Sequence, residues 1–223
     1  MVGAGPGMGR AIAAALGNRH APVGLVARRP EALAAVAADL ADIGIAAKAY
    51  PADVSDELQL RSALAAAMAD LGPPRVVVYN ASLYVAGTPT MVDVAAFTAG
   101  LAVGITGALI TLQECAPALV AQQGRGTFLL TGGGLALDPW PEASGLAVQK
   151  AGLRNLAYAA AAELAPQGVH VATVTIRGVI EAGGPMDPDR IARVYAELAD
   201  PKSGPDTSRP VEIHVTAEGP QPA

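Results

Sequence analysis

The stretch Gly3-Ala4-Gly5-Pro6-Gly7-Met8-Gly9-Arg10 places a glycine at every second position near the start of the chain. Three of these glycines match the spacing GxxxGxG, whereas GxGxxG fails because its third glycine falls on Met8 or Arg10. Glycines let a backbone turn tightly and approach a pyrophosphate, which then lies at the N-terminus of the following helix. The alternative is an ordinary glycine-rich turn between a strand and a helix. The stretch predicts a nucleotide-phosphate loop, with candidate residues Gly3, Gly5, Gly7, Met8 and Gly9.

Short β-branched runs alternate with alanine-rich stretches after this loop. The predicted strands are Val23–Ala27, Ile45–Tyr50, Arg75–Asn80, Thr127–Thr131, Val169–Thr175 and Val211–Val215. The predicted helices are Met8–Leu16, Glu31–Ile43, Asp56–Leu71, Val92–Val120, Ala143–Ala165 and Asp189–Leu198. Strands that alternate with helices indicate βαβ units, and therefore a parallel sheet with helices on both faces.

These elements predict an α/β fold with a Rossmann-like, doubly wound parallel sheet in three layers. We expect residues 1–217 to form a single nucleotide-binding domain and residues 218–223, rich in proline and glycine, to be a disordered tail. Only Met1 and Val2 precede Gly3, whereas a strand usually has about five residues. The expectation is a truncated first strand, or a natural start upstream of Met1.

The region about 20 residues after the glycine loop bears on the choice of nucleotide. NAD-binding folds usually carry Asp or Glu there, which holds the ribose hydroxyls. Here the sequence reads Leu25-Val26-Ala27-Arg28-Arg29-Pro30-Glu31, with two arginines in place of the acid. A guanidinium holds a 2′-phosphate through paired hydrogen bonds, so NADP(H) is favoured over NAD(H). The alternative is that Arg28 and Arg29 only solvate the start of a helix.

Composition excludes several classes of function. Among 223 residues, 15 Lys and Arg stand against 20 Asp and Glu, a net charge of −5, so neither nucleic acid nor an anionic membrane is an expected partner. No run of about 18 apolar residues predicts a membrane span. One cysteine, Cys115, excludes a disulfide framework and a multi-cysteine metal site, and it suits a reducing cytoplasm.

Two further motifs follow predicted strands in a familiar order. Asp53-Val54 comes after the second predicted strand, and Tyr79-Asn80-Ala81-Ser82 comes after the third. With GxxxGxG, these motifs resemble those of the short-chain dehydrogenase/reductase family over nearly the whole chain. In that family the first pair flanks the adenine ring, and the second motif reads NNAG, so this chain differs at its first and last positions. The resemblance implies cofactor-binding roles for Asp53, Val54, Asn80, Ala81 and Ser82.

The resemblance fails at the catalytic residues. The family uses Tyr and Lys in YxxxK, where the lysine holds the nicotinamide ribose and lowers the pKa of the tyrosine. Here the stretch reads Leu146-Ala147-Val148-Gln149-Lys150, which keeps Lys150 for the ribose and replaces the tyrosine by Leu146. The family's serine aligns with Gly133 and its helix-four asparagine with Gly104. The resemblance therefore implies a site that has lost three of its four catalytic side chains.

Other hydroxyl groups are candidate substitutes. Tyr84 follows the NNAG-like motif, where the chain borders the nicotinamide in this family, so it is the candidate catalytic residue beside Lys150. Ser144 and Thr131 lie close in sequence to the lost tyrosine and serine. The alternative is that these three are a half-buried loop tyrosine, a helix cap and a strand residue. Trp140, the only tryptophan, either lines the substrate pocket or caps the core.

Two functions from different classes remain open. The first is an NADP(H)-dependent oxidoreductase that acts on an unidentified small molecule with a displaced or rebuilt proton donor. The second is a non-catalytic nucleotide-binding protein, such as a redox-state sensor or a partner subunit. The resemblance also implies a homodimer or homotetramer, paired through the long alanine-rich helices Val92–Val120 and Ala143–Ala165.

Overall fold

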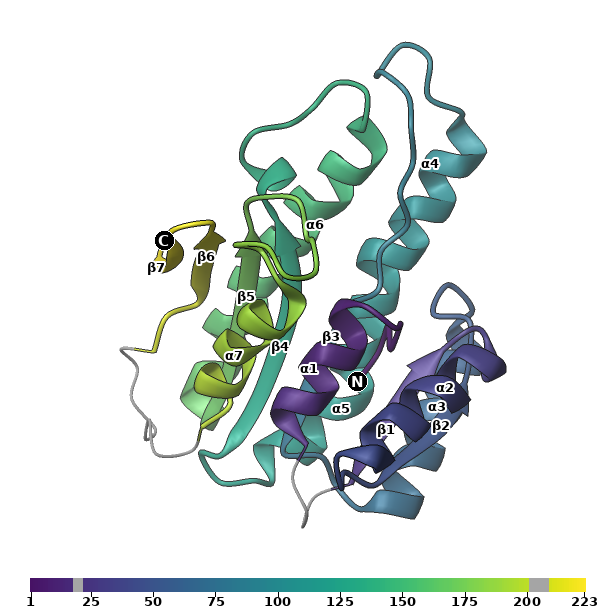
Figure 1. The fold of residues 1–223 in the computed structure, drawn as a ribbon, viewed down its shortest axis with the longest axis vertical. Helices are drawn as coiled ribbons and strands as arrows, with labels where there is room; N and C mark the ends of the chain where they lie inside the picture. Colours follow the sequence, from purple (N-terminus) through teal and green to yellow (C-terminus); the bar gives the residue numbers. More distant parts are fainter. Residues whose placement is uncertain (18–21, 201–208) are drawn as a thin grey trace.

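A mostly parallel sheet with helices on both faces forms the fold (Figure 1). The computed structural model describes residues 1–17, 22–200 and 209–223. Strands in this part of the chain are β1 (Val23–Ala27), β2 (Ala47–Pro51), β3 (Val76–Tyr79), β4 (Gly126–Gly133), β5 (Val169–Ile176), β6 (Glu212–Thr216) and β7 (Gly219–Pro222). The predicted α/β fold in three layers is confirmed.

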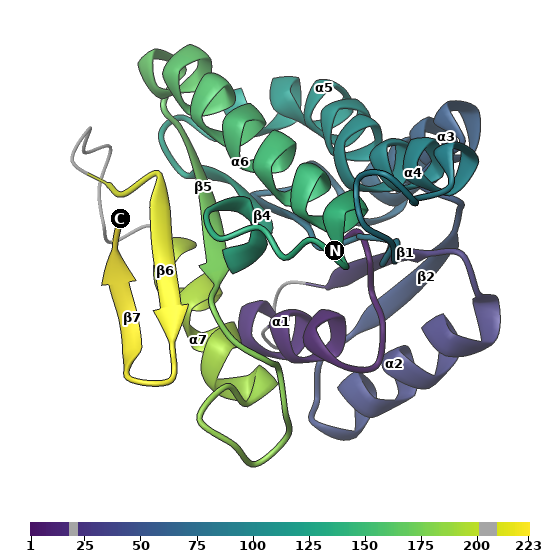
Figure 2. The same cartoon turned by 90° about the horizontal axis from the view of Figure 1, so that it is seen from above.

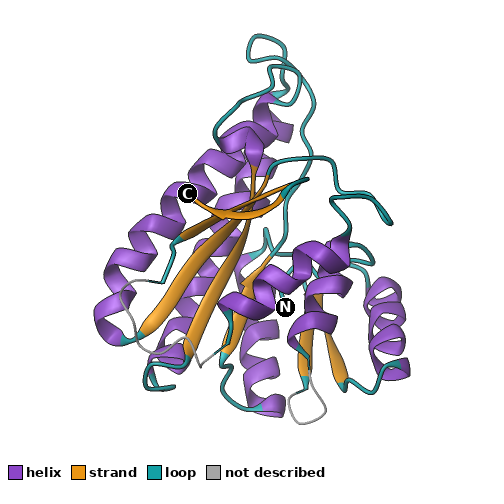
Figure 3. Ribbon diagram, turned by 60° about the vertical axis from the view of Figure 1, so that its left-hand side comes forward, coloured by secondary structure: helices purple, strands orange, loops and turns teal. Residues whose placement is uncertain are grey.

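The helices divide between the two faces of the sheet, as Figures 2 and 3 show. One face carries α1 (Met8–Leu16), α2 (Pro30–Asp42) and α7 (Pro188–Leu198). The other carries α3 (Glu57–Leu71), α4 (Val94–Leu101), α5 (Gly107–Val120) and α6 (Ser144–Leu164). Short helices η1 (Ala102–Thr106), η2 (Gly134–Ala136) and η3 (Ala165–Gln167) complete the set among the described residues. Buried aliphatic side chains such as Leu60, Leu119 and Leu153 fill the space between the second group and the strands.

The sheet runs in the order β2-β1 and then β3-β4-β5-β6-β7, and the first residues of the chain join its two parts. Val2 forms parallel bridges with Val26 of β1 on one side and with Tyr79 of β3 on the other. A single bridging residue therefore stands where a central strand would run, which confirms the truncated first strand. The predicted strands and helices agree with those observed to within about two residues at each end, apart from the long helix.

The predicted helix Val92–Val120 is interrupted in its middle. A π-helical turn, Ala102–Thr106, separates α4 from α5. The Val103 carbonyl in this turn accepts a hydrogen bond from the Tyr79 hydroxyl at the end of β3. π-Turns inside helices occur frequently at functional sites, and this one lies beside the loop that follows β3. Helical periodicity did not predict the interruption.

The same segment has the length and apolar composition of a membrane-crossing helix. Among the described residues, Val94–Val120 alone passes that test, and 39% of its apolar window is buried inside the protein. Ala108, Leu112 and Leu119 belong to the core beneath it. Glu114 on α5 pairs with Arg61 of α3 at 3.1 Å. Part of its apolar surface therefore belongs to the interior of the fold.

The C-terminus differs from the prediction. Gly219–Pro222 form β7, which pairs antiparallel with β6 at the edge of the sheet (Figure 2). Gly219 has φ +130°, a conformation that glycine tolerates, and the Thr216 hydroxyl donates to its carbonyl at 3.2 Å. Prolines are accepted in an edge strand because one side of that strand needs no backbone donors. The predicted disordered tail over residues 218–223 is therefore wrong, since its proline and glycine serve a hairpin.

Candidate active site

A groove of about 240 Å³ lies beyond the carboxyl ends of neighbouring parallel strands. The loops that line it follow Val2, β1, β2 and β3, which is where open α/β sheets bind their ligands. We call it the cofactor groove. Its lining includes most of the predicted cofactor residues, namely Gly3, Gly5, Arg28, Arg29, Val54, Asn80, Ala81 and Ser82. Gly7, Met8, Gly9, Asp53 and Lys150 are not among its lining residues.

The glycines of the loop have two different roles. Gly3 has φ +83°, and a Cβ there would lie 2.5 Å from the Ala81 nitrogen; a Cβ at Gly9 would lie 2.6 Å from the Gly3 carbonyl oxygen. These two positions need glycine because the loop folds closely on itself and on the segment after β3. At Gly5 and Gly7 a Cβ would meet no protein atom within 4 Å. The space that these two glycines leave is open to a ligand.

The N-terminus of α1 points its backbone donors out of the helix without a side-chain cap. Gly7 is the N-cap residue, and the first bonds into this turn are Arg10 N–H to the Gly5 carbonyl at 2.8 Å and Ala11 N–H to the Gly7 carbonyl at 3.1 Å. The Met8 side chain is buried in the core, so its contribution to a ligand is limited to its backbone. An uncapped helix N-terminus favours an anion through its free N–H groups and its dipole.

Asn80 ties the loop after β3 to the glycine loop. Its side-chain amide donates to the Gly3 carbonyl at 3.0 Å, and its backbone N–H donates to the Val2 carbonyl at 2.9 Å. Ala81 and Ser82 follow it along the wall of the groove. The NNAG-like motif therefore supports the shape of the glycine loop, which is a positioning role that sequence spacing did not reveal.

Two exposed arginines stand at one end of the groove. Arg28 follows β1 and Arg29 is the N-cap residue of α2. In the described part of the chain neither forms an ion pair. The pKa of Asp53 is lowered, mainly by hydrogen bonds from Ser55, and the positive charge of Arg28 adds to the effect. Two guanidinium groups are thus available to an external anion beside a carboxylate that already has partners.

The predicted reaction end, formed by α6 and the end of β4, contains Lys150 outside the lining of the cofactor groove and little other polar chemistry. Lys150 lies on α6 with 8% of its surface exposed, and its Nζ donates to the Thr131 carbonyl at 2.8 Å. Burial lowers the pKa of this ammonium to about 8. Gly133, at the end of β4, packs against the stem of Lys150, since a Cβ there would lie 3.3 Å from Lys150 Cγ. Leu146 stands one helical turn before Lys150, so no hydroxyl is present at either position.

The candidate substitutes mostly have other partners. The Ser144 hydroxyl donates to the Gly87 carbonyl at 2.6 Å, and the Thr131 hydroxyl is 2.8 Å from the Tyr195 hydroxyl. Both therefore make structural contacts, but Ser144 is not the helix cap that the alternative expected, because Ala143 is the N-cap residue of α6 and no side chain caps that helix. Tyr84 has 59% of its surface exposed and Trp140 has 53%, so both side chains are largely open to solvent. Tyr84 is the hydroxyl that remains available for chemistry.

Gln149 is a site residue that sequence reasoning missed. It is 1% exposed, and its Nε2 donates to the Leu83 carbonyl at 2.8 Å while its Oε1 accepts from the Leu83 N–H at 3.3 Å. Leu83 lines the cofactor groove, so this side chain anchors the wall that carries Tyr84. A Cβ at Gly104 would lie 2.6 Å from its Oε1, and one at Gly100 2.6 Å from its Nε2. An amide in an otherwise apolar helical stretch beside Lys150 is the signal that could have identified it.

The chain resembles known proteins over most of its length. The family model of the short chain dehydrogenases matches residues 1–183. A crystal structure of a metagenomic short-chain oxidoreductase in complex with NADP is 31% identical, with a TM-score of 0.85 over 96% of this chain and 94% of that chain. The short-chain dehydrogenase/reductase eriH of Hericium erinaceus is 30% identical over 174 residues, which are 76% of this chain and 69% of that protein.

A further relative is inactive by name. The inactive 2-(S)-hydroxypropyl-CoM dehydrogenase 2 of Xanthobacter autotrophicus is 30% identical over 162 residues, which are 73% of this chain and 67% of that protein. The family model covers most of the chain, and the fold and the glycine loop agree with it. The chain therefore belongs to the short-chain dehydrogenase/reductase family.

Proposed function

We propose that this protein is an NADP(H)-binding oxidoreductase with an atypical active site. The observation that carries the proposal is the cofactor groove, which is lined by Gly5, a position with open space beside it, and by Arg28 and Arg29. An ordinary turn before α1 does not require open space beside Gly5, so this space favours a bound ligand. The similar metagenomic short-chain oxidoreductase, whose structure is a complex with NADP, supports the same cofactor.

The residues present fit a dinucleotide that carries a 2′-phosphate. The uncapped N-terminus of α1 and the space beside Gly5 and Gly7 would hold the pyrophosphate. Arg28, assisted by Arg29, would hold the 2′-phosphate through charge-assisted hydrogen bonds. Val54 and Ala81 offer apolar contacts to the adenine ring. The chemistry that NADP(H) supplies when bound is hydride transfer.

At the reaction end, Lys150 would hold the ribose hydroxyls, for which its Nζ would exchange its bond with the Thr131 carbonyl. Leu146 and Gly133 offer no O–H donor to a substrate oxygen. A carbonyl substrate would therefore take its proton from Tyr84 or from water, and we expect turnover to be very slow. We propose that the substrate is a small molecule.

The second candidate is a non-catalytic nucleotide-binding sensor or partner subunit. The replacement of a tyrosine and a serine by Leu146 and Gly133 favours it, because those changes remove proton transfer but leave the cofactor groove unchanged. The relative that is inactive by name is a precedent for such a loss. In either case we propose a homodimer or homotetramer, with α5 and α6 at the interface, which light scattering at micromolar concentration would test.

Titration with NADPH and NADH, followed by turnover assays on a panel of aldehydes and ketones, distinguishes the two candidates. We expect NADPH to bind more tightly than NADH and turnover to stay well below about 1 s⁻¹. Turnover that is measurable above the rate without protein supports the oxidoreductase, and binding without turnover supports the sensor. Failure of both dinucleotides to bind would overturn both candidates.

A further inference from the structure

Two consecutive glycines, Gly133 and Gly134, lie where β4 ends and η2 begins. A Cβ at Gly133 would lie 3.3 Å from Cγ of Lys150, and a Cβ at Gly134 would lie 3.4 Å from Cγ of Arg177. The side-chain stems of two cations therefore pack on neighbouring glycines. Since neither glycine has a side chain, the charged groups at this strand end come from α6 and from the residue that follows β5.

The backbone of Arg177 is fixed by the sheet. Arg177 directly follows β5, and its N–H donates to the Val215 carbonyl at 2.8 Å, which continues the pairing of β5 with β6. Gly134, which packs against its stem, belongs to the segment after β4. The carboxyl ends of neighbouring parallel strands are where open α/β sheets bind their ligands. The side chain of Arg177 therefore starts at the edge of the sheet that also carries the cofactor groove.

The guanidinium group of Arg177 has unused hydrogen-bond donors. Its Nη2 donates to the Asp138 carboxylate at 2.7 Å, and among the described residues this is its only side-chain partner. The Arg177 side chain is 39% exposed and the Asp138 side chain is 74% exposed. An ion pair so open to solvent contributes little to stability, so a second carboxylate can join Asp138 or displace it. The Nε and Nη1 donors of Arg177 remain available for that contact.

A guanidinium group in this position suits one class of ligand. Its planar array of N–H groups matches the two oxygens of a carboxylate, which it binds through paired, charge-assisted hydrogen bonds. An arginine is not deprotonated in proteins, so Arg177 would orient a substrate rather than supply a proton to it. Lys150 adds a second positive charge on the neighbouring glycine, which favours an anionic substrate over a neutral one.

We propose that Arg177 determines substrate specificity by binding the carboxylate of a carbonyl substrate. This inference rests on the proposed oxidoreductase function and names the class of substrate that it would take. The bond to Asp138 is the internal counterpart of the contact, because the same guanidinium group binds a carboxylate there at 2.7 Å. A neutral aldehyde or ketone of the same shape gains nothing from Arg177 and binds more weakly.

The test compares two probes with the same ketone group, benzoylformate and its methyl ester, which lacks the charge. Both are titrated calorimetrically into the protein saturated with NADP⁺, which has no hydride to transfer to the ketone. We expect benzoylformate to bind at least about tenfold more tightly than the ester. Arg177→Met should remove that difference by weakening the binding of benzoylformate, and it should leave the affinity for the ester unchanged.

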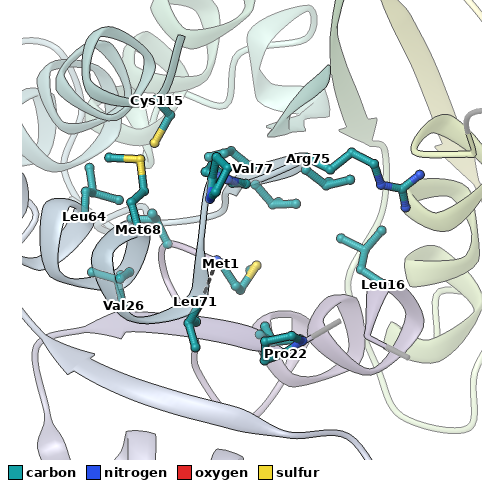
Figure 4. A pocket seen from close by; sticks show the side chains of 18 of the residues that line it. Met1, Leu16, Pro22, Val26, Leu64, Met68, Leu71, Arg75, Val77 and Cys115 are labelled. Carbon is teal, nitrogen blue, oxygen red and sulfur yellow. Dashed lines mark hydrogen bonds between the residues drawn. The ribbon is translucent and has the colours of Figure 1, made fainter. Parts of the chain in front are cut away.

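Arg75→Met is the matched control. Arg75 is partly buried and forms no ion pair in the described part of the chain. It lines a separate, mostly apolar cavity of about 350 Å³ beside β1 and β3 (Figure 4), which is an alternative place for an anion with an apolar ring. Arg75→Met should leave both affinities unchanged. Loss of benzoylformate binding in Arg75→Met, or equal affinities of the unmodified protein for the two probes, would overturn the proposal.

These outcomes are distinct from failure of the proposed function. Arg177 does not line the cofactor groove, so NADPH should bind Arg177→Met as tightly as it binds the unmodified protein. If dinucleotides bind but the two probes bind equally, only the inference about Arg177 is wrong. If no dinucleotide binds, the proposed function is wrong, and the same titrations without nucleotide should still show the loss of benzoylformate binding in Arg177→Met.

Discussion

The candidate active site has a cofactor end and a reaction end, and the two depend on different features of the chain. At the cofactor end, the main features are backbone conformations and open space: Gly3 and Gly9 close the loop, and Gly5 and Gly7 leave room for a ligand. At the reaction end, the chemistry of the family depends on particular side chains, and Leu146 stands where the tyrosine would be. A fold can keep the first while it loses the second, because loss of a hydroxyl does not disturb the packing of a loop. We therefore expect that binding and catalysis can be separated in this protein.

The largest effect that would sharpen this comparison is restoration of the reaction end. Leu146→Tyr with Gly133→Ser should raise kcat/KM for carbonyl reduction by about 10²–10⁴-fold, the usual contribution of a positioned proton donor. The serine needs a small shift of the Lys150 stem, because a Cβ at Gly133 would lie 3.3 Å from Lys150 Cγ. Steady-state kinetics with NADPH measures the gain.

Leu146→Phe with Gly133→Ser is the matched control, since it adds the ring without the hydroxyl. A gain in that control equal to the gain with tyrosine would show that packing, not proton transfer, limits the rate. If the unmodified protein already turns over at about 1 s⁻¹ or faster, the reaction end has been rebuilt. In that case Tyr84→Phe should remove the activity.

Substitution of single glycines in the loop tests the cofactor end. Gly3→Ala should destabilise the protein by about 3 kcal/mol or more, because φ is +83° and the new Cβ would lie 2.5 Å from the Ala81 nitrogen. Gly5→Ala should leave the fold intact, since its Cβ meets no protein atom within 4 Å. Chemical denaturation measures both.

NADPH titration then separates the two glycines. Gly5→Ala should weaken binding although the protein remains folded, because Gly5 lines the groove. Unchanged affinity in Gly5→Ala would mean that the open space beside it does not receive the pyrophosphate.

Lys150 links stability to pH at the reaction end. Its pKa is lowered to about 8 by burial, against 10.5 for an unburied lysine, so the unfolded chain binds more protons between these pH values. The free energy of unfolding should therefore rise by about 3 kcal/mol as the pH increases from 8 to 10.5. Denaturation of the unmodified protein and of Lys150→Met across this range isolates the effect, because only the variant lacks the group. Parallel pH profiles for the two proteins would contradict it.

The smallest of these effects concerns the choice of cofactor. Arg28→Ala should weaken NADPH binding by about 10- to 100-fold and leave NADH binding unchanged, since only NADPH carries the 2′-phosphate. Arg125→Ala is the matched control, because Arg125 is also exposed but directly precedes β4, at the amino ends of the parallel strands and therefore away from the cofactor groove. Calorimetric titration of both dinucleotides measures the ratio. An equal loss for NADPH and NADH would mean that Arg28 does not read the 2′-phosphate.

Much of the fold could be predicted because it depends on local patterns. Buried strands such as Val76–Tyr79 are continuous apolar runs, and the alanine-rich stretches between strands have helical composition. The two exceptions differ in kind. The π-turn lies where the Tyr79 hydroxyl bonds the Val103 carbonyl, a contact between residues 24 positions apart. β7 pairs with the neighbouring strand β6 in a local hairpin, and its proline and glycine gave it the composition of a disordered tail.

The candidate site shows the same division. The glycine loop, Arg28 and Arg29 were predicted because phosphate binding requires particular residues at short spacing. The structure brings them into one groove with Asn80, Ala81 and Ser82. The support that Asn80 gives to Gly3 and that Gln149 gives to Leu83 joins residues 77 and 66 positions apart. Contacts of that kind have no signature in a single sequence.

The carboxamide of Gln149 occupies the space beside Gly100 and Gly104, where a larger residue would otherwise place its side chain. This packing limits which substitutions the three positions can accept during evolution. We expect Gly100, Gly104 and Gln149 to change together, because a side chain at either glycine position would collide with the Gln149 amide as it now stands. Substitutions there should be tolerated only together, with a larger residue at 104 accompanied by a shorter one at 149. In an alignment of close homologues, these three columns should covary, although two of them lie some 45 positions or more from the third.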